Sequence, residues 1–243
     1  MGKLFGTDGI RGVVNAGLDA DLAYKVGLAA AEVLAKGKQP GEKPLVTIGK
    51  DTRISGDLLK GSLIAGLCTA GADVLDLGTL PTPGVAWVTV DEKVDAGIVI
   101  SASHNPFEHN GIKIFKGDGY KLPDEVENQI EAHVFNNCTD IRLAEGADIG
   151  RIKVCRTGVK DYVDFLQEHI DADLTGLKVL FDCANGASAR VAQELFPRLG
   201  CECGFIGTQQ DGVSVNDGCG STHLETLEAA VKQGGYDCGI AFD

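Results

Sequence analysis

The chain has 243 residues, 44% of them hydrophobic, which is enough for one large domain or two smaller ones with a true core. The net charge of −13 argues against nucleic acid as a partner, because binding a phosphate backbone requires a basic face. A small anionic substrate remains compatible with this charge, since it needs only a few local cations. No apolar run reaches the ~20 residues that span a bilayer, so we expect no membrane partner.

The cysteines and the N-terminus indicate a reducing compartment. The eight cysteines have no regular spacing and no Cys-x-x-Cys pair, and Met1 to Leu4 lead directly into structured sequence without a signal peptide. We therefore expect a cytoplasmic protein whose thiols are free and buried. Four thiols lie in or beside apolar segments: Cys68, Cys155, Cys183 and Cys238.

Helical and strand periodicities alternate along the first half of the chain. Ser55 is predicted to cap a helix, and Pro123 fits the first turn of another, whose positive end Asp124 and Glu125 favour. The expected elements are a helix over 22–34 ending at Gly37, a strand at 45–49, a helix from Ser55 to about Gly71, a strand at 74–77, a rigid turn at 81–83 before the apolar run 85–90, strands from 97 and from 112, and a helix from Pro123.

A second series follows a stretch without periodicity, residues 136–155, which we interpret as a linker. Thr222 and Glu225 have the spacing of a capping box. Such alternation predicts mostly parallel sheets with helices on both faces, and hence an α/β fold class. The expected elements are a helix over 159–170, a strand at 177–181, a helix over 187–199, a strand at 201–206, a helix from Thr222 and a strand at 238–242.

Residues 96–115 are the most informative segment. An apolar strand runs into the small polar loop 101–106, and the chain is then expected to turn at Asn110-Gly111 before a second apolar run. This order places Ser103, His104 and Lys113 at the mouth of a strand, and ligands of open α/β sheets bind outside the carboxyl ends of strands. Ser103 is therefore a candidate for covalent chemistry.

Two further polar segments leave alternatives open. Residues 5–12 contain three glycines and Arg11, whose planar donors suit phosphate oxygens, but an ordinary turn with a solvated arginine explains them better. Residues 49–56 follow a strand and open a helix, so they could bind an anion or form a structural charge cluster of Lys50, Asp51 and Arg53. Neither segment is a P-loop, no dinucleotide motif or Gly-x-Ser-x-Gly elbow occurs, and the five histidines lack zinc spacing.

Asp243 ends the chain directly after the apolar run 239–242, so we expect the chain to be part of a longer protein. A carboxylate at a strand tip is a hard oxygen ligand for Mg²⁺. A phosphate on Ser103 would be a second ligand and would add about −1.5 to −2 charge, which Lys113 and Arg11 could neutralise. These residue types favour phosphoryl transfer over acyl transfer without excluding the latter.

Several motifs resemble those of the α-D-phosphohexomutases. Ser-Ala-Ser-His-Asn-Pro at 101–106, followed by Asn-Gly-Ile-Lys at 110–113, resembles the phosphoserine loop of that family. Phe-Gly-Thr-Asp-Gly-Ile-Arg-Gly at 5–12 looks like the N-terminal signature of the branch that acts on glucosamine phosphates. The resemblance covers essentially the whole chain and continues through residues 48–56, 81–83, 182–187 and 220–223.

The resemblance implies a four-domain enzyme, of which this chain holds two consecutive three-layer α/β/α domains with mostly parallel mixed sheets, the second incomplete. Domain I would span residues 1–137, a linker 138–157, and domain II 158–243, truncated at the start of a metal-binding loop. The partners would then be a phosphosugar substrate and the missing C-terminal domains of the same protein. No oligomeric state is predicted.

The resemblance also implies roles for particular residues. Ser103 would carry the phosphoryl group, with His104 and Lys113 assisting proton movement and neutralising charge. Arg11 would support the phosphoserine loop, and Arg11, Asn105 and Lys113 would bind phosphate. Asp243 matches the first aspartate of the family's Asp-Gly-Asp-Gly-Asp-Arg loop, in which three aspartates and the phosphoserine hold Mg²⁺. The other two aspartates are absent, so we expect the chain alone to be inactive.

The implied reaction interconverts glucosamine 6-phosphate and glucosamine 1-phosphate through a 1,6-bisphosphate, for the synthesis of UDP-N-acetylglucosamine. Two alternatives stay open. A phosphomannomutase or phosphoglucomutase would share the same motifs, because the residues that contact the sugar lie outside this chain. A non-catalytic module that binds phosphate-bearing ligands would be favoured if the native chain ended at Asp243.

Overall fold

The computed structural model describes residues 4–39 and 41–243. The prediction that residues 1–3 lead directly into structured sequence lies outside these ranges. The first part of the chain contains β1 (Ile10–Val13), α1 (Ala20–Ala35), β2 (Leu45–Lys50), α2 (Gly56–Thr69), β3 (Asp73–Thr79), α3 (Thr82–Asp91), β4 (Ala96–Ile100), β5 (His109–Lys116) and α4 (Asp124–Phe135). The second part contains a short 3-10 helix (Gly146–Asp148), β6 (Ile152–Val154), α5 (Gly158–His169), β7 (Lys178–Asp182), α6 (Ser188–Arg198), β8 (Glu202–Ile206), α7 (Glu225–Gly234) and β9 (Cys238–Ala241).

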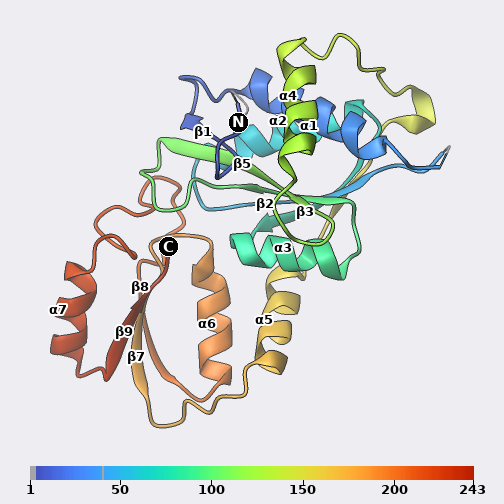
Figure 1. The fold of residues 1–243 in the computed structure, drawn as a ribbon. Helices are drawn as coiled ribbons and strands as arrows, with labels where there is room; N and C mark the ends of the chain where they lie inside the picture. The colour runs from blue at the N-terminus through green and yellow to red at the C-terminus, as the bar shows by residue number, and fades with distance from the viewer. Residues whose placement is uncertain (1–3, 40) are drawn as a thin grey trace.

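The strands form two sheets, which lie in the upper and lower parts of the molecule in Figure 1. The first has six strands in the order β1-β5-β4-β2-β3-β6, and the second has three in the order β8-β7-β9. In the first sheet β4, β2, β3 and β6 run parallel, while β5 is antiparallel to both of its neighbours. All pairings of the second sheet are parallel. The predicted α/β class is confirmed.

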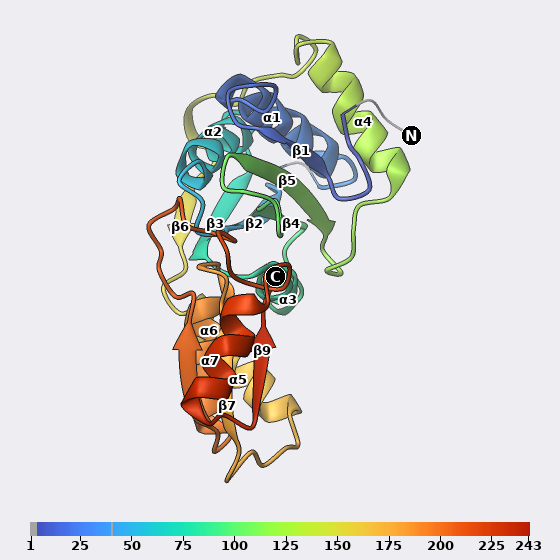
Figure 2. The ribbon, with the colours of Figure 1, turned by 90° about the vertical axis from the view of Figure 1, so that its left-hand side faces the viewer.

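Helices cover both faces of each sheet. The core on one face of the first sheet includes apolar residues of α1, α2 and α4, and α3 lies on the opposite face (Figures 1 and 2). In the second sheet, α6 packs through Ala189 and Ala192 against Phe181, and α7 packs its Leu227 and Val231 near Gly239. We call the six-stranded sheet with α1 to α4 the first unit, and the three-stranded sheet with α5 to α7 the second unit. Both units have three layers, helix, sheet and helix, as the alternating pattern predicts.

A shared apolar core joins the two units. It contains Leu75, Leu77 and Val99 of the first sheet together with Tyr162 of α5 and Leu195 of α6. The contact between α3 and α5 is aromatic: the Trp87 ring lies 4.9 Å from the Phe165 ring and 5.8 Å from that of Tyr162, measured between centroids. The two sheets are therefore held in one packed body rather than joined by a flexible connection.

Two turn predictions are wrong. Pro81-Thr82-Pro83 does not form a free turn but leads into α3, in which Pro83 occupies the first turn, where a missing N–H costs nothing. Asn110-Gly111 lies inside β5, where Gly111 pairs with Arg11 of β1. The chain reverses earlier, between Ser101 and Glu108, because β4 ends at Ile100.

Both predicted helix caps are also wrong. Ser55 precedes α2 without capping it, and its hydroxyl instead accepts a hydrogen bond from the buried Asn110 at 2.9 Å. Helix α7 begins at Glu225, after Leu224, so Thr222 and Glu225 do not form a capping box. Local spacing predicted that helices begin near these residues, but the Ser55 hydroxyl bonds to Asn110 of β5 and not to the N-terminus of α2.

Three other findings qualify the sequence predictions. The stretch expected as a linker contributes β6, which pairs with β3 in the first sheet.

All eight thiols are free, as predicted, but Cys238 is exposed instead of buried, and Cys68 and Cys155 are only partly covered. Among residues 4–39 and 41–243, no helix has the length and apolarity needed to cross a membrane.

Candidate active site

The loop after β4 presents Ser103 at the carboxyl end of a completely buried strand. All five residues of β4 are buried, so the strand is held firmly, and the polar loop begins where the apolar run ends. Ser103 has a φ of +56°, in the left-handed region that is unfavourable for residues other than glycine. Such backbone strain persists only where surrounding contacts hold it, and it is concentrated at functional sites.

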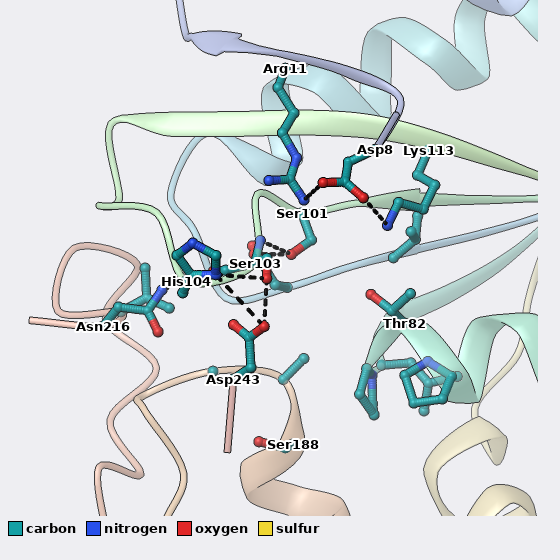
Figure 3. Close-up of a pocket in the computed structure, with 18 residues that line it drawn as sticks. Asp8, Arg11, Thr82, Ser101, Ser103, His104, Lys113, Ser188, Asn216 and Asp243 are labelled. Carbon is teal, nitrogen blue, oxygen red and sulfur yellow. Dashed lines mark hydrogen bonds and ion pairs between the residues drawn. The ribbon is translucent and has the colours of Figure 1, made fainter. Parts of the chain in front are cut away.

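The Ser103 hydroxyl meets a carboxylate that is 140 positions further along the chain. Its Oγ donates to Asp243 Oδ2 at 2.6 Å, as Figure 3 shows, and lies 3.4 Å from His104 Nδ1. His104 Nδ1 is itself 3.9 Å from the same carboxylate oxygen. The His104 and Asp243 side chains are about half exposed, so this group of three is open to a ligand from solvent.

Arg53 holds the loop that carries Ser103. Its side chain is completely buried, and all five N–H groups are used. Nε donates to Asp51 at 2.8 Å, one terminal nitrogen donates to the carbonyls of Ser103 and Asn105 at 2.7 and 2.8 Å, and the other donates to those of Pro106 and His109. The planar donor set of arginine suits such a constellation of acceptors, whereas lysine could not supply it.

The charge cluster at 49–56 is therefore structural. Asp51 accepts from Arg53 and also from the Ser101 hydroxyl at 2.7 Å, and that hydroxyl in turn accepts from the backbone N–H of Ser103 at 3.1 Å. Of the two alternatives that the sequence left open, these contacts favour the structural cluster. The contact of Arg53 with the loop could not be predicted from the sequence, because nothing in the local spacing around Arg53 indicates residues 103–109.

Arg11 and Lys113 lie on neighbouring strands and share one counter-ion. Arg11 is 3.5 Å from one carboxylate oxygen of Asp8, and Lys113 Nζ is 3.8 Å from the other (Figure 3). Gly9 makes this possible, since its φ is +83° and a Cβ there would lie 2.3 Å from the Ile112 carbonyl. The tight turn thus brings Asp8 against β5, and both cations face the same region as Ser103.

Within residues 4–39 and 41–243, the side chains that donate to the loop carbonyls are Arg53 and Asn216. Support of the phosphoserine loop by Arg11, which the resemblance implies, stays a prediction. Arg11 borders the cavity next to Lys113. Asn105 does not border the cavity, and the hydrogen bonds that it makes within the described structure use its backbone.

The cavity between the two units has a volume of about 410 Å³, which is in the range of small-molecule sites. The first unit contributes Ser103, His104, Lys113 and Arg11, and the beginning of α3 lies beside them. The second unit contributes Asp243 together with Gly186 and Ala187 of the motif at 182–187. It also contributes three residues that were not singled out from the sequence: Ser188, Val215 and Asn216.

A divalent cation would find only part of a coordination shell here. Within residues 4–39 and 41–243, no three His, Cys, Asp or Glu side chains form a group that could hold a metal ion. Asp243 and the Ser103 hydroxyl supply two hard oxygens that lie 2.6 Å apart, which is the donor chemistry that Mg²⁺ prefers. These residues fit Mg²⁺ as two contributors to a larger set.

Comparison with known proteins shows the family to which the chain belongs. A family model described as phosphoglucomutase/phosphomannomutase, alpha/beta/alpha domain I, matches residues 2–140, and the chain therefore belongs to this family. Among curated proteins, the chain is 49% identical over its whole length to the phosphoglucosamine mutase of Clostridium novyi and 52% identical to that of Alkaliphilus oremlandii. The chain spans about half of the length of these curated relatives, 54% in each case.

Solved structures show the same fold. A phosphoglucomutase/phosphomannomutase family protein from Burkholderia thailandensis is 30% identical, with a TM-score of 0.82 over 99% of this chain and 52% of that one. A protein described as a putative phosphomannomutase from Thermus thermophilus is 23% identical, with a TM-score of 0.78 over 95% of this chain and 52% of that one. The second comparison concerns the fold alone.

Proposed function

We propose that the full-length protein is a phosphoglucosamine mutase that interconverts glucosamine 6-phosphate and glucosamine 1-phosphate. The observation that carries the proposal is the contact of the Ser103 hydroxyl with Asp243, in a cavity that also holds Arg11 and Lys113. Identities of about 50% to phosphoglucosamine mutases support the choice of glucosamine over glucose or mannose. The substrate would be a cytoplasmic phosphosugar.

The reaction begins with a phosphoryl group on Ser103. It passes to O1 of glucosamine 6-phosphate, whose hydroxyl proton leaves to a neighbouring base, while the bond between phosphorus and the Ser103 Oγ breaks and Oγ takes up a proton. The resulting 1,6-bisphosphate reorients and the Ser103 Oγ attacks the phosphorus at O6. The bond between that phosphorus and O6 breaks, O6 takes up a proton, and glucosamine 1-phosphate leaves with the enzyme rephosphorylated. Since an unassisted serine is a poor nucleophile, its proton must pass to a nearby acceptor.

The surrounding side chains have separate tasks in this scheme. His104 and Asp243 lie within 3.4 and 2.6 Å of the Ser103 Oγ, close enough to accept its proton. Arg11 and Lys113, which border the cavity, neutralise the charge of the transferring group. Mg²⁺, bound by Asp243, by phosphoryl oxygens on Ser103 and by ligands outside these 243 residues, would stabilise the developing charge when present.

We also propose the division into domain I at 1–137, a linker at 138–157 and domain II at 158–243. The separate sheets of the first and last segments support it, and β6 marks the point where the linker joins the first sheet. Because the relatives are about twice as long and two aspartates of the implied metal loop are absent from these residues, we expect this chain by itself to show no mutase turnover.

Labelling with a hexose 1,6-bisphosphate carrying ³²P tests the nucleophile in the full-length protein. We expect label on Ser103 alone, and complete loss of labelling and of turnover in Ser103→Ala. Ser188→Ala is the matched control, because Ser188 borders the same cavity but lies on α6, and it should label normally. Label on any other residue, or normal turnover of Ser103→Ala, would contradict the assignment.

Lys113→Ala separates catalysis from folding in the same assay. We expect turnover to fall by about 10²-fold or more with an unchanged melting temperature, because Lys113 is partly exposed and its ion pair with Asp8 is long, at 3.8 Å. A large drop in melting temperature would indicate a structural role.

Activity measured side by side on glucosamine, glucose and mannose 1-phosphates decides between the proposed substrate and the alternatives.

A further inference from the structure

The strained conformation of Ser103 needs an explanation beyond its own loop. A φ of +56° costs a serine about 1–2 kcal/mol, and the residue would relax if its carbonyl were free to rotate. The position of Oγ would change with that relaxation, because φ and ψ of Ser103 decide where its side chain points. Whatever fixes the carbonyls on either side of the turn therefore fixes the reacting atom.

Two donors from different units hold the same two carbonyls. The Ser103 carbonyl accepts from Arg53 at 2.7 Å and from Asn216 Nδ2 at 2.9 Å, and the Asn105 carbonyl accepts from Arg53 at 2.8 Å and from Asn216 Nδ2 at 3.1 Å. A carbonyl oxygen has two lone pairs, so both acceptors are fully used. Arg53 belongs to the first unit, whereas Asn216 comes from the second.

Asn216 is itself fixed in place. Its φ of +60° is in the left-handed region, which asparagine tolerates better than most residues, and its backbone N–H donates to the Ala184 carbonyl at 2.9 Å. The loop that carries it is also tied to the first unit, since the Ile54 N–H donates to the Gly212 carbonyl at 2.9 Å. The amide is thus presented to the Ser103 loop by a segment with little freedom to move.

Asparagine has the appropriate chemistry for this position. Its amide nitrogen carries two hydrogens, one for each carbonyl, whereas the isosteric aspartate would place oxygen against oxygen. Nothing in the local sequence around residue 216 predicts contact with a loop more than 100 positions earlier. The contact exists only because the second unit packs against the first.

We propose that Asn216 is a positioning residue for Ser103: it fixes the nucleophile loop from the second unit and so couples phosphoryl transfer to the docking of the two units. This inference rests on the proposed function, in which Ser103 is the nucleophile. Asn216 does not act on the reacting atoms, and it works through the carbonyls of Ser103 and Asn105.

The test uses the full-length protein and two variants. Asn216→Gly removes the amide but keeps a residue that accepts positive φ, and Asn216→Asp keeps the shape but removes the donors. We expect single-turnover labelling of Ser103 by ³²P-labelled hexose 1,6-bisphosphate to slow by roughly 10- to 100-fold in both, with KM within about twofold of the wild type and an unchanged melting temperature. Asn137→Gly is the matched control, because Asn137 also has positive φ but lies beyond α4, where it accepts from Lys25.

Hydrogen exchange gives a readout that does not depend on turnover. The backbone N–H groups of Ser103 and Asn105 should exchange faster in both Asn216 variants, while those of β4 and β5 keep their protection. An unchanged labelling rate, or unchanged exchange in the loop, overturns the inference, as does a fall in melting temperature with normal labelling of the folded protein. If the loop exchanges faster in the Asn216 variants but the wild-type protein is never labelled at Ser103, the proposed function is refuted instead.

Discussion

Arg53 is a fully buried cation, and each of its five side-chain N–H groups donates a hydrogen bond. Burying a guanidinium is costly unless it is paired and hydrogen-bonded throughout. Here the partners are Asp51 and four carbonyls of the loop that carries Ser103, so the desolvation cost is offset by contacts that also shape the site. The same side chain therefore serves stability and geometry.

Arg53→Ala should destabilise the protein by about 3–5 kcal/mol, because it removes the buried positive charge that pairs with Asp51 and the four hydrogen bonds from the guanidinium to backbone carbonyls. Chemical denaturation monitored by circular dichroism measures the change in the free energy of unfolding. Arg142→Ala, at an exposed arginine, is the control and should change this free energy by no more than ~0.5 kcal/mol. Similar stability of the two variants would show that the buried network is unimportant.

Cysteine reactivity follows burial. The pKa of the Cys183 thiol is raised to about 12, first by burial and second by the neighbouring Asp182 carboxylate. Since only the thiolate reacts, iodoacetamide should leave Cys183 unmodified up to about pH 9 in the folded protein and modify the exposed Cys238 first. Peptide mass mapping with and without urea checks this order, and equal modification of the two thiols in the folded protein would contradict it.

At the scale of elements, glycines decide how closely α1 and α2 can approach. A Cβ at Gly66 of α2 would lie 2.1 Å from the Tyr24 carbonyl, and one at Gly27 of α1 would lie 2.4 Å from the Leu63 carbonyl. The two helices therefore touch backbone to backbone, and neither can accept a larger residue there without moving. The helical periodicity of the sequence predicts both helices but not this contact.

Gly66→Ala should lower the free energy of unfolding by at least about 1–3 kcal/mol, since the clash is with backbone that cannot rotate away. Gly61→Ala on the same helix should raise it by roughly 0.5–1 kcal/mol, because a Cβ there meets open space and alanine favours the helix. Thermal unfolding of the two variants should therefore move in opposite directions. A stabilised Gly66→Ala variant would contradict the described packing.

At the scale of the whole molecule, the shared core makes the two units one cooperative body. Leu195 of α6 is 5% exposed and belongs to the same cluster as Leu75 and Val99 of the first sheet. The cavity with Ser103 and Asp243 lies between these units, so the geometry of the site depends on how they pack. Stability and site geometry are thus linked through α3, α5 and α6.

Leu195→Ala should cost about 2–5 kcal/mol and shift every unfolding probe together. Trp87, the only tryptophan in the sequence, reports on the contact between α3 and α5, and far-UV circular dichroism reports on the whole chain. Leu143→Ala, at a side chain that is 51% exposed, is the control with little expected effect. Separate midpoints for the two probes in the wild type would show that the units unfold independently.

The sequence by itself determined the α/β class, most of the elements, and the segments that hold Ser103, Lys113 and Arg11. These features depend on short-range physics: the period of apolar residues, the residue types that favour turns, and a motif read as contiguous letters. The same reasoning wrongly predicted a turn at Asn110-Gly111, because these residues lie inside β5 and pair with β1.

Only the tertiary structure decided which groups hold the Ser103 loop. It assigned Arg53 to the carbonyls of that loop and supplied Asn216 from the second unit, whereas the family resemblance already implied that Asp243 and Ser103, now 2.6 Å apart, would lie together. The physical reason is that buried carbonyls must find donors wherever the packed chain offers them, at separations in sequence that no local pattern records. Ser103 could be proposed as the nucleophile from the sequence, whereas the contacts that fix the position of its loop could not.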